Sequence, residues 1–178
     1  MIYLDEILLL KKEQSDAIRT KARLVSELEE INIATEVERK RRIKRAAYDN
    51  EEARYLKDRT ALDQIKQFTP VASEPLTEED FDFGEEQSNI QILKDVKNVE
   101  NGYYLVIAVN SDVEKRYEFL TKPVSAGETN IYFLYYLNTS KYYIYYKKFD
   151  DINTANTAIE SKGNKPYNSK MSMVKIEE

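Results

Sequence analysis

The stretch Ile131–Phe149 constrains the fold of this chain most strongly, because it holds seven of the fourteen tyrosines. Its β-branched and aromatic residues suit a pleated surface, which predicts two strands, Ile131–Leu137 and Tyr142–Tyr146. Residues 138–141, with the sequence NTSK, supply turn chemistry between them. Two strands joined by so short a connection run antiparallel, so the stretch predicts a hairpin at the centre of a sheet.

Composition excludes several classes of function. The chain has 178 residues, which suits one or two domains, and its formal net charge is −5. An acidic chain is a poor candidate for nucleic-acid binding, which relies on Lys and Arg contacts to phosphate. The absence of both cysteine and histidine removes disulfides, thiol chemistry and imidazole ligands. We therefore expect no enzyme activity, no cofactor and no metal, and we interpret Asp112, Glu114, Asp150 and Asp151 as helix-capping acids.

The chain is not expected to span a membrane. Its most apolar start, Ile2–Leu10, is interrupted by Asp5 and Glu6 and is far shorter than the ~20 residues that a spanning helix needs. The same stretch lacks the basic region and cleavage site of a signal peptide. If the protein acts outside the cytoplasm, we expect this chain to be a fragment or a processed form.

Residues 1–69 contain neither glycine nor proline and are rich in helix formers. They predict a helical or coiled-coil segment, either one long helix or two helices with a break. Its apolar stripe is strongest at Ile18, Val25 and Leu28, with Leu24 and Ile31 alongside. A long helix of this kind cannot bury itself, which predicts self-association or a docked partner. The basic run Glu36–Arg45 has almost no stripe and fits a solvated face or a surface for an acidic partner.

Residues 70–89 are predicted to be an acidic linker, with seven acidic side chains and no basic one. Pro70 ends the helix, while Pro75 and Gly84 argue against a packed element. Phe81 and Phe83 alternate with acidic residues, so an alternative is that this segment adds as an edge strand or fills a groove.

Residues 90–178 show the pattern of a small α+β domain in the order β-α-β-β-α-β. Residues Ser111–Glu114 have the spacing of a capping box, and Asp150 or Asp151 caps the second helix. Such an order predicts a four-stranded antiparallel sheet with two helices on one face, which leaves the other face open. The elements expected around the hairpin are strand Tyr103–Val109, helix Lys115–Ala126, helix Ile152–Ser161 and strand Met171–Ile176.

Two stretches of this domain resemble the SPOR (sporulation-related repeat) family. Asn110-Ser111-Asp112, after a strand and before a helix, is similar to the family's first-strand motif, hydrophobic-x-hydrophobic-G-x-F-S-[ND]. Tyr142–Phe149 and the helix with Ala155 that follows it resemble the third-strand motif, which ends in G-P-F. The chain departs from these motifs, with Ile107 at the first Gly and Lys147-Lys148 at Gly-Pro. The resemblance covers about residues 99–177.

A closer resemblance is to divergent SPOR-like ends of large cell-surface proteins of gliding, type IX-secreting Bacteroidota. There a helical segment, an acidic linker containing DFGEEQSNI and a tyrosine-rich domain occur in the same order. The SPOR resemblance implies a non-catalytic domain of the cell envelope, in the periplasm or at the cell surface. It also implies binding of peptidoglycan glycan strands on the helix-free face of the sheet, where aromatic rings pack against sugars.

Strand alternation, aligned to the family, divides the side chains between the two faces. It predicts Tyr142, Ile144 and Tyr146 beneath the helices. On the other two strands it predicts the set Tyr104, Val106, Ala108, Ser172, Val174 and Ile176 beneath the helices as well. For the strand Ile131–Leu137 the choice of face stays open. The ligand-binding residues predicted on the open face are Tyr103, Leu105, Tyr143, Tyr145, Met173 and Lys175.

Three functions compete on these observations. The first is an envelope module that binds peptidoglycan glycan, and the second is a protein–protein module that assembles or anchors a secretion or gliding apparatus. The loss of the Gly and Gly-Pro positions favours the second, as would a sheet face filled by Phe81, Phe83 or the helical segment. The third, RNA binding, shares the β-α-β-β-α-β order but lacks the RNP1 pattern in Tyr142–Phe149.

Overall fold

The structure is a computed structural model that describes residues 2–88 and 90–178. Backbone contacts divide the chain into two units, one ending at Asp49 and one running from Asn50 to Glu178. Sequence reasoning had started the folded domain at residue 90. The C-terminal unit is larger than that, because a second helix and most of the predicted linker pack into it.

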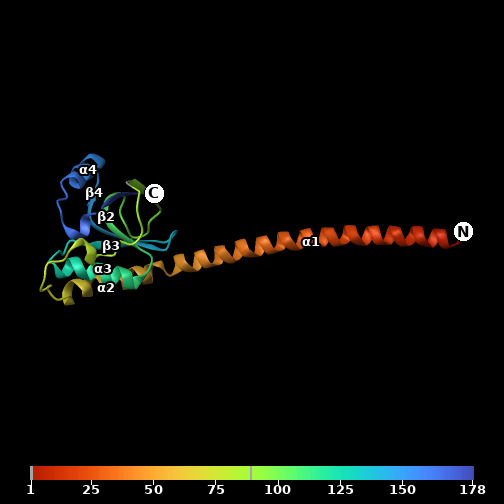
Figure 1. Ribbon diagram of the computed structural model, residues 1–178, viewed down its shortest axis with the longest axis horizontal. Helices are drawn as coiled ribbons and strands as arrows, with labels where there is room; N and C mark the ends of the chain where they lie inside the picture. Colours follow the sequence, from red (N-terminus) through yellow and green to blue (C-terminus); the bar gives the residue numbers. More distant parts are fainter. Residues whose placement is uncertain (1, 89) are drawn as a thin grey trace. The chain divides into compact units, whose positions relative to one another are not determined.

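The N-terminal unit is helix α1, Ile2–Asp49, which is drawn in red and orange in Figure 1. From Tyr3 onward its side chains are exposed, apart from three half-buried ones near its C-terminal end. Surface ion pairs support the polar stretch, with Arg39 Nη2 2.8 Å from Glu36 and Arg42 Nε 3.5 Å from Glu38. Such pairs add only ~0.2–0.5 kcal/mol each, so they do not replace a packed face.

Helix α2, Glu51–Phe68, follows after a break at Asn50, so residues 2–68 form two helices and not one. Leu62 and Ile65 of α2 are buried in the main core. The helix ends at the residue before Thr69-Pro70, where proline cannot continue the backbone hydrogen bonding. α2 therefore belongs to the compact unit, which sequence reasoning did not foresee.

The sheet of the C-terminal unit has five strands in the order β1-β5-β2-β4-β3. β3 (Tyr132–Tyr136) and β4 (Lys141–Phe149) form the tyrosine hairpin, with Ser140 at a φ of 56° in its turn. β2 (Gly102–Asn110) pairs antiparallel with both β4 and β5 (Ser172–Glu177). The mixed α+β class and the long N-terminal helix are confirmed.

The predicted four-stranded antiparallel sheet lacked one strand. β1, Ile90–Lys94, adds to the edge of the sheet and runs parallel to β5. Its apolar residues alternate as a half-buried strand should, with Leu93 inside and Ile90 and Ile92 exposed. The sheet is therefore mixed, which sequence reasoning missed because it began the domain's first strand at Tyr103.

Two helices connect the strands, and their caps come from aspartates. In α3, Val113–Ser125, the Asp112 side chain accepts a hydrogen bond of 2.7 Å from the Lys115 backbone N–H, so Asp112 and not Ser111 is the cap. In α4, Ile152–Glu160, Asp151 accepts one of 2.9 Å from Thr154, so of the two predicted candidates Asp151 and not Asp150 is the cap. Two short 3₁₀ turns, Glu78–Asp80 and Pro166–Asn168, complete the elements.

Two irregularities in the β2–β4 ladder decide which side chains face the helices. Val106 pairs with Tyr145. The neighbouring pair on one side is Leu105 with Lys147, and on the other side it is Ala108 with Ile144. The ladder thus passes over Tyr146 in β4 and Ile107 in β2, as it does at β-bulges. Each skipped residue reverses the in–out alternation of its strand beyond that point.

One face of the sheet carries the helices. α2 and α3 pack there, side by side in Figure 1, over Ile107, Ala108 and Ile144. α4 covers a neighbouring patch in which Leu105 and Met173 contact Ala155. Phe81 fills the main core from the segment before β1, and Phe83 packs against it.

The other face is closed by curvature of the sheet itself. Gln91 Nε2 of β1 donates a hydrogen bond of 3.2 Å to the Tyr143 hydroxyl of β4, although β5 and β2 lie between these strands. Twisted sheets coil in this way. A second core with no helical residue fills the concave side: Leu93, Tyr104, Val106, Val109, Leu134, Tyr143, Val174 and Ile176.

Candidate binding site

The six predicted ligand-binding residues do not share one open face. Tyr143 and Tyr145 lie on the helix-free side, as expected, but Tyr143 is only 1% exposed. Leu105 and Met173 are buried beneath α4, with Tyr103 packed beside them. Lys175 lies next to Tyr103 in strand pairing and forms a 2.7 Å ion pair with Glu177.

The bulge at Ile107 explains this division. Ala108 lies with the helices, as predicted. On the N-terminal side of Ile107 the predicted alternation is reversed, so Tyr104 and Val106 lie in the helix-free core. β5 pairs with that part of β2, so its faces are reversed as well, and Val174 and Ile176 lie in the helix-free core. The placement of Tyr142 and Ile144 on the helix side agrees with the structure.

The helix-free face is a closed core and not an exposed tyrosine strip. Val96 and Val99, from the connection between β1 and β2, pack against it. The Tyr104 hydroxyl donates a hydrogen bond of 2.7 Å to the Glu100 carbonyl oxygen in the same connection. Burial raises the pKa of Tyr104 to about 12, so this hydroxyl remains a donor throughout the neutral range.

The acidic segment Glu78–Glu86 is docked on the compact unit, beginning with the 3₁₀ turn Glu78–Asp80 and continuing as a non-helical stretch that bridges to β2 at Gly84. Its backbone pairs with the end of β2, with Glu85 N–H donating to the Val109 carbonyl at 3.0 Å and Val109 N–H donating to the Phe83 carbonyl at 3.2 Å. Phe81 and Phe83 pack edge-on against Phe119 of α3. Lysines meet its polar groups, with Lys141 binding Glu85, Lys122 the Asp80 carbonyl, and Lys115 Nζ 4.0 Å from Asp82.

A cleft of about 620 Å³ lies where β4 extends beyond β3. β3 pairs with β4 as far as Tyr145, so between Tyr146 and Phe149 β4 pairs with β2 alone. The other walls come from the turn after α3 and from the loop between α4 and β5. The volume falls within the range of small-ligand and peptide sites. The cleft is lined by Glu128, Asn130, Tyr132, Tyr145, Tyr146, Lys147, Lys148, Lys162, Lys165, Tyr167 and Asn168.

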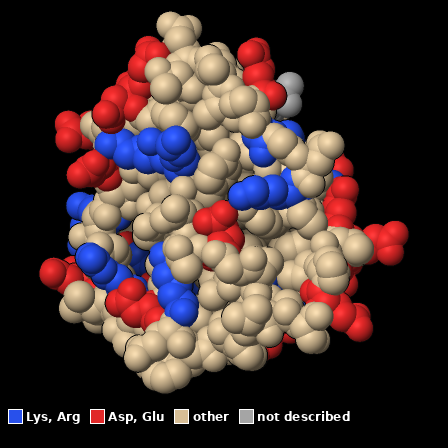
Figure 2. Space-filling view, turned by 90° about the vertical axis from the view of Figure 1, so that its left-hand side faces the viewer, with Lys and Arg blue, Asp and Glu red and all other residues tan. Residues whose placement is uncertain are grey.

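Four lysines and one glutamate give this cleft a positive charge in an acidic protein. Lys148 is neutralised at its rim, with Nζ 2.8 Å from Glu100 and 3.1 Å from Asp150. The Lys147 ammonium lies 4.9 Å from the centre of the Phe149 ring, a cation–π contact that leaves its charge uncompensated. Figure 2 shows a face on which basic side chains gather toward the middle while most acids lie at the margin.

Glu128 organises one wall of the cleft. Its carboxylate accepts hydrogen bonds from the Tyr167 hydroxyl at 2.9 Å, the Lys165 ammonium at 3.4 Å and the Asn130 backbone N–H at 3.0 Å. Burial alone would raise the pKa of Glu128, but these hydrogen bonds outweigh it and the pKa is lowered. Glu128 is therefore a carboxylate at neutral pH and holds Tyr167 and Lys165 in place.

Sequence reasoning predicted Tyr145 but missed the rest of this cleft. Six of the missed side chains lie in two connections and the other four on β3 and β4, and their proximity depends on where β3 begins. A basic signal was present, since residues 162–170 carry three lysines and no acid.

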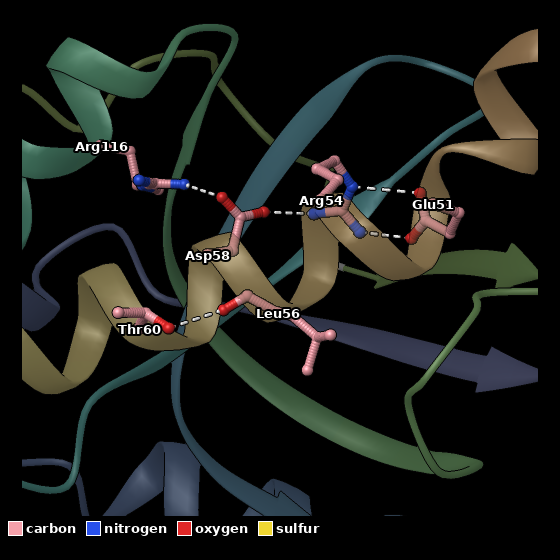
Figure 3. A network of polar contacts seen from close by, with 6 residues as sticks. All are labelled: Glu51, Arg54, Leu56, Asp58, Thr60 and Arg116. Carbon is pink, nitrogen blue, oxygen red and sulfur yellow. Dashed lines mark hydrogen bonds and ion pairs between the residues drawn. The ribbon is translucent and has the colours of Figure 1, made fainter.

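A buried polar network anchors α2 to α3 (Figure 3). Arg116 of α3 donates a hydrogen bond of 2.7 Å from Nη1 to Asp58 Oδ1, and Arg54 bridges Asp58 and Glu51 on α2. The Arg116 guanidinium also lies 4.4 Å from the Phe133 ring centre and 4.6 Å from that of Tyr142. Burial without partners is costly for charges, so this network gives α2 a defined position on the sheet.

Helix α1 carries an apolar seam with no partner within the described chain. Every seventh residue from Tyr3 to Ile31 is apolar. At the intervening heptad position, Ile7 and Leu28 are apolar, whereas Gln14 and Lys21 are polar. Leu28 is 58% exposed and Ile31 60%. The seam spans about 42 Å of helix and ends where Glu38 takes the next position. Its sevenfold set is Tyr3, Leu10, Ala17, Leu24 and Ile31.

Across residues 2–88 and 90–178, no group of acidic side chains forms a metal-binding cluster. Over the same residues, no helix has both the length and the apolar character to cross a membrane. In comparisons with known proteins, no family model, no curated protein and no solved structure matches this chain.

Proposed function

We propose that this protein is a non-catalytic assembly module of the cell envelope. In this proposal α1 associates with α1 of further copies as a coiled coil. The compact unit, residues 50–178, then binds a protein partner in a secretion or gliding apparatus. The envelope location, in the periplasm or at the cell surface, is part of the proposal and rests on the family resemblance alone.

One observation carries the proposal, the exposed heptad seam of α1. Burying a Leu or Ile side chain stabilises a protein by ~1.5–3 kcal/mol, and α1 leaves a row of them in water. Contiguous exposed apolar surface of this kind marks a protein interface. Self-association buries the same residues on both partners, which the heptad spacing permits.

The closed helix-free face favours assembly over glycan binding. Peptidoglycan binding was predicted on an open sheet face, and that face is a filled core in which Tyr143 is buried. Phe81 and Phe83, which the protein–protein alternative would have placed on that face, pack into the helix-side core instead. Glycan binding stays a prediction, now without the surface first assigned to it.

The oligomeric state of the full chain tests the proposal, measured by sedimentation velocity. We expect the wild type to sediment as an oligomer and the variant Ile31→Asp, which puts a charge into the seam, to sediment as a monomer. Ile33→Asp is the matched control, because Ile33 is equally apolar and exposed but lies on the opposite side of the helix from the seam. A monomeric wild type, or equal dissociation of both variants, would show that the seam is not an interface.

A further inference from the structure

The free edge of β4 in the cleft is a vacant site for a strand. Between Tyr146 and Phe149, β4 pairs with β2 on one side and has no strand on the other, among the described residues. A strand edge presents a row of backbone donors and acceptors, and an extended peptide can pair with it. Here the edge opens into a cleft with tyrosine walls and not onto flat surface.

The charge of the cleft selects the chemistry of the occupant. Lys147 has no acidic partner in the described structure, and Lys162 Nζ contacts only carbonyl oxygens, at 3.2 and 3.5 Å. Lys165 shares Glu128 with Tyr167. Carboxylates of an incoming segment would find ammonium donors on both walls. The tyrosine rings would take apolar or aromatic side chains at alternate positions.

The chain itself provides an example of such binding. Its segment Glu78–Glu86 combines a backbone bridge to β2 at Gly84, acidic side chains that meet lysines, and phenylalanines at alternate positions that pack in the core. The cleft at β4 offers the same three contacts, a strand edge, lysines and aromatic walls, but at a different place on the unit.

We propose that the cleft binds an extended acidic segment of a partner protein, with aromatic residues at alternate positions, as an added strand along Tyr146–Phe149. This inference rests on the proposed function as an assembly module and assigns one of its partner sites. It does not depend on α1, so the two proposals can fail separately.

The first experiment measures binding of a labelled synthetic peptide, TEEDFDFGEEQ, to the full chain by fluorescence anisotropy. We expect the double variant Lys147→Ala/Lys165→Ala to weaken binding about three- to tenfold. Lys94→Ala, on the opposite edge of the sheet, should leave it unchanged. Near-UV circular dichroism verifies that each variant is folded, and a repeat in the Ile31→Asp background separates peptide binding from self-association.

Two controls identify the site and the binding mode. Lys141→Ala weakens binding only if the peptide displaces the chain's own docked segment, which would overturn the proposal. Two peptides N-methylated at alternate residues, offset by one, test strand pairing, because the N–H groups of a paired strand point to its neighbour at every second residue. We expect one of the two to lose binding and the other to retain it.

Equal binding by both methylated peptides would reduce the site to a charged patch and overturn strand addition. No binding of the unmodified peptide by the folded wild type would likewise overturn the proposal. Retention on amidase-stripped peptidoglycan, lost in Lys147→Ala/Lys165→Ala, would assign the cleft to a saccharide instead.

Discussion

Helices α1 and α2 follow one another in the chain and have similar compositions, yet their surroundings differ completely. α2 buries Leu62 and Ile65 and ties Asp58 to Arg116 of α3. α1 is more than twice as long and leaves its larger apolar side chains in water. The break at Asn50 separates a helix that has found a partner within the chain from one that has not.

The comparison shows that composition predicts a helix but not what the helix packs against. Both helices lack glycine and proline, which is enough to predict them. Burial of α2 depends instead on the sheet residues around Ile107 and on Arg116, which enter the chain some forty or more residues later. If α1 is to bury its seam, the partner must come from another chain.

The largest expected effect comes from breaking the anchor of α2. Asp58→Ala should lower the free energy of unfolding of the compact unit by about 3–5 kcal/mol, because Arg116 would remain buried without its carboxylate. Near-UV circular dichroism in denaturant follows this unit selectively, since twelve of the fourteen tyrosines lie beyond Asn50. Asp63→Asn, an exposed acid on the same helix, should change stability by less than ~0.5 kcal/mol.

The next effect contrasts one apolar deletion in each helix. Ile65→Ala, at a residue 3% exposed, should cost the compact unit about 2–5 kcal/mol through a cavity in the main core. Leu28→Ala should leave unfolding of the compact unit unchanged and weaken self-association. Denaturation by near-UV dichroism and sedimentation of the same two proteins check both expectations. Loss of compact-unit stability in Leu28→Ala would mean that α1 is not an independent unit.

The smallest effect concerns the wall of the cleft and depends on pH. Because the folded-state pKa of Glu128 lies below the ordinary 4.5, its carboxylate stabilises the fold above that value. This contribution is lost as the pH falls through the lowered pKa. Glu128→Gln should therefore cost about 1 kcal/mol at neutral pH. The difference from wild type should shrink in acid.

Unfolding curves at neutral and acidic pH measure that difference, with Glu160→Gln, an exposed acid on α4, as the control. A constant gap between wild type and Glu128→Gln across the range would assign the effect to packing and not to charge.

Local signals predicted much of the fold. The alternating tyrosines predicted the hairpin, and the Asp151 cap and the element order from β2 onward followed from short-range chemistry. β1 was missed because this five-residue edge strand lies at the start of the predicted domain, outside the β-α-β-β-α-β order that was expected. Asp58 and Arg116 form a polar pair although they are far apart in the chain. No local sequence pattern indicates this pair, so the docking of α2 was not predictable.

The candidate site was less predictable than the fold. To assign side chains to a face, one must know which residues of each strand point to which side. No sequence pattern around Ile107 indicates a bulge that would change this. The cleft depends on β3 beginning opposite Tyr145, four residues short of the end of β4, which is a property of pairing and not of either sequence. Of its residues, sequence reasoning had placed Tyr145 in the binding set.

The two bulges have a consequence for how this sheet tolerates change. Side chains alternate between the two faces of the sheet with a period of two residues. Ile107 adds one extra residue to β2, and Tyr146 adds one to β4. Their shifts cancel, because the pairs on either side of Val106–Tyr145 share one register. Neither residue takes part in a pair, so losing either one would remove its own bulge and leave the remaining pairs and their faces unchanged. Each bulge therefore absorbs its extra residue locally, and the sheet can lose or keep either one independently of the other.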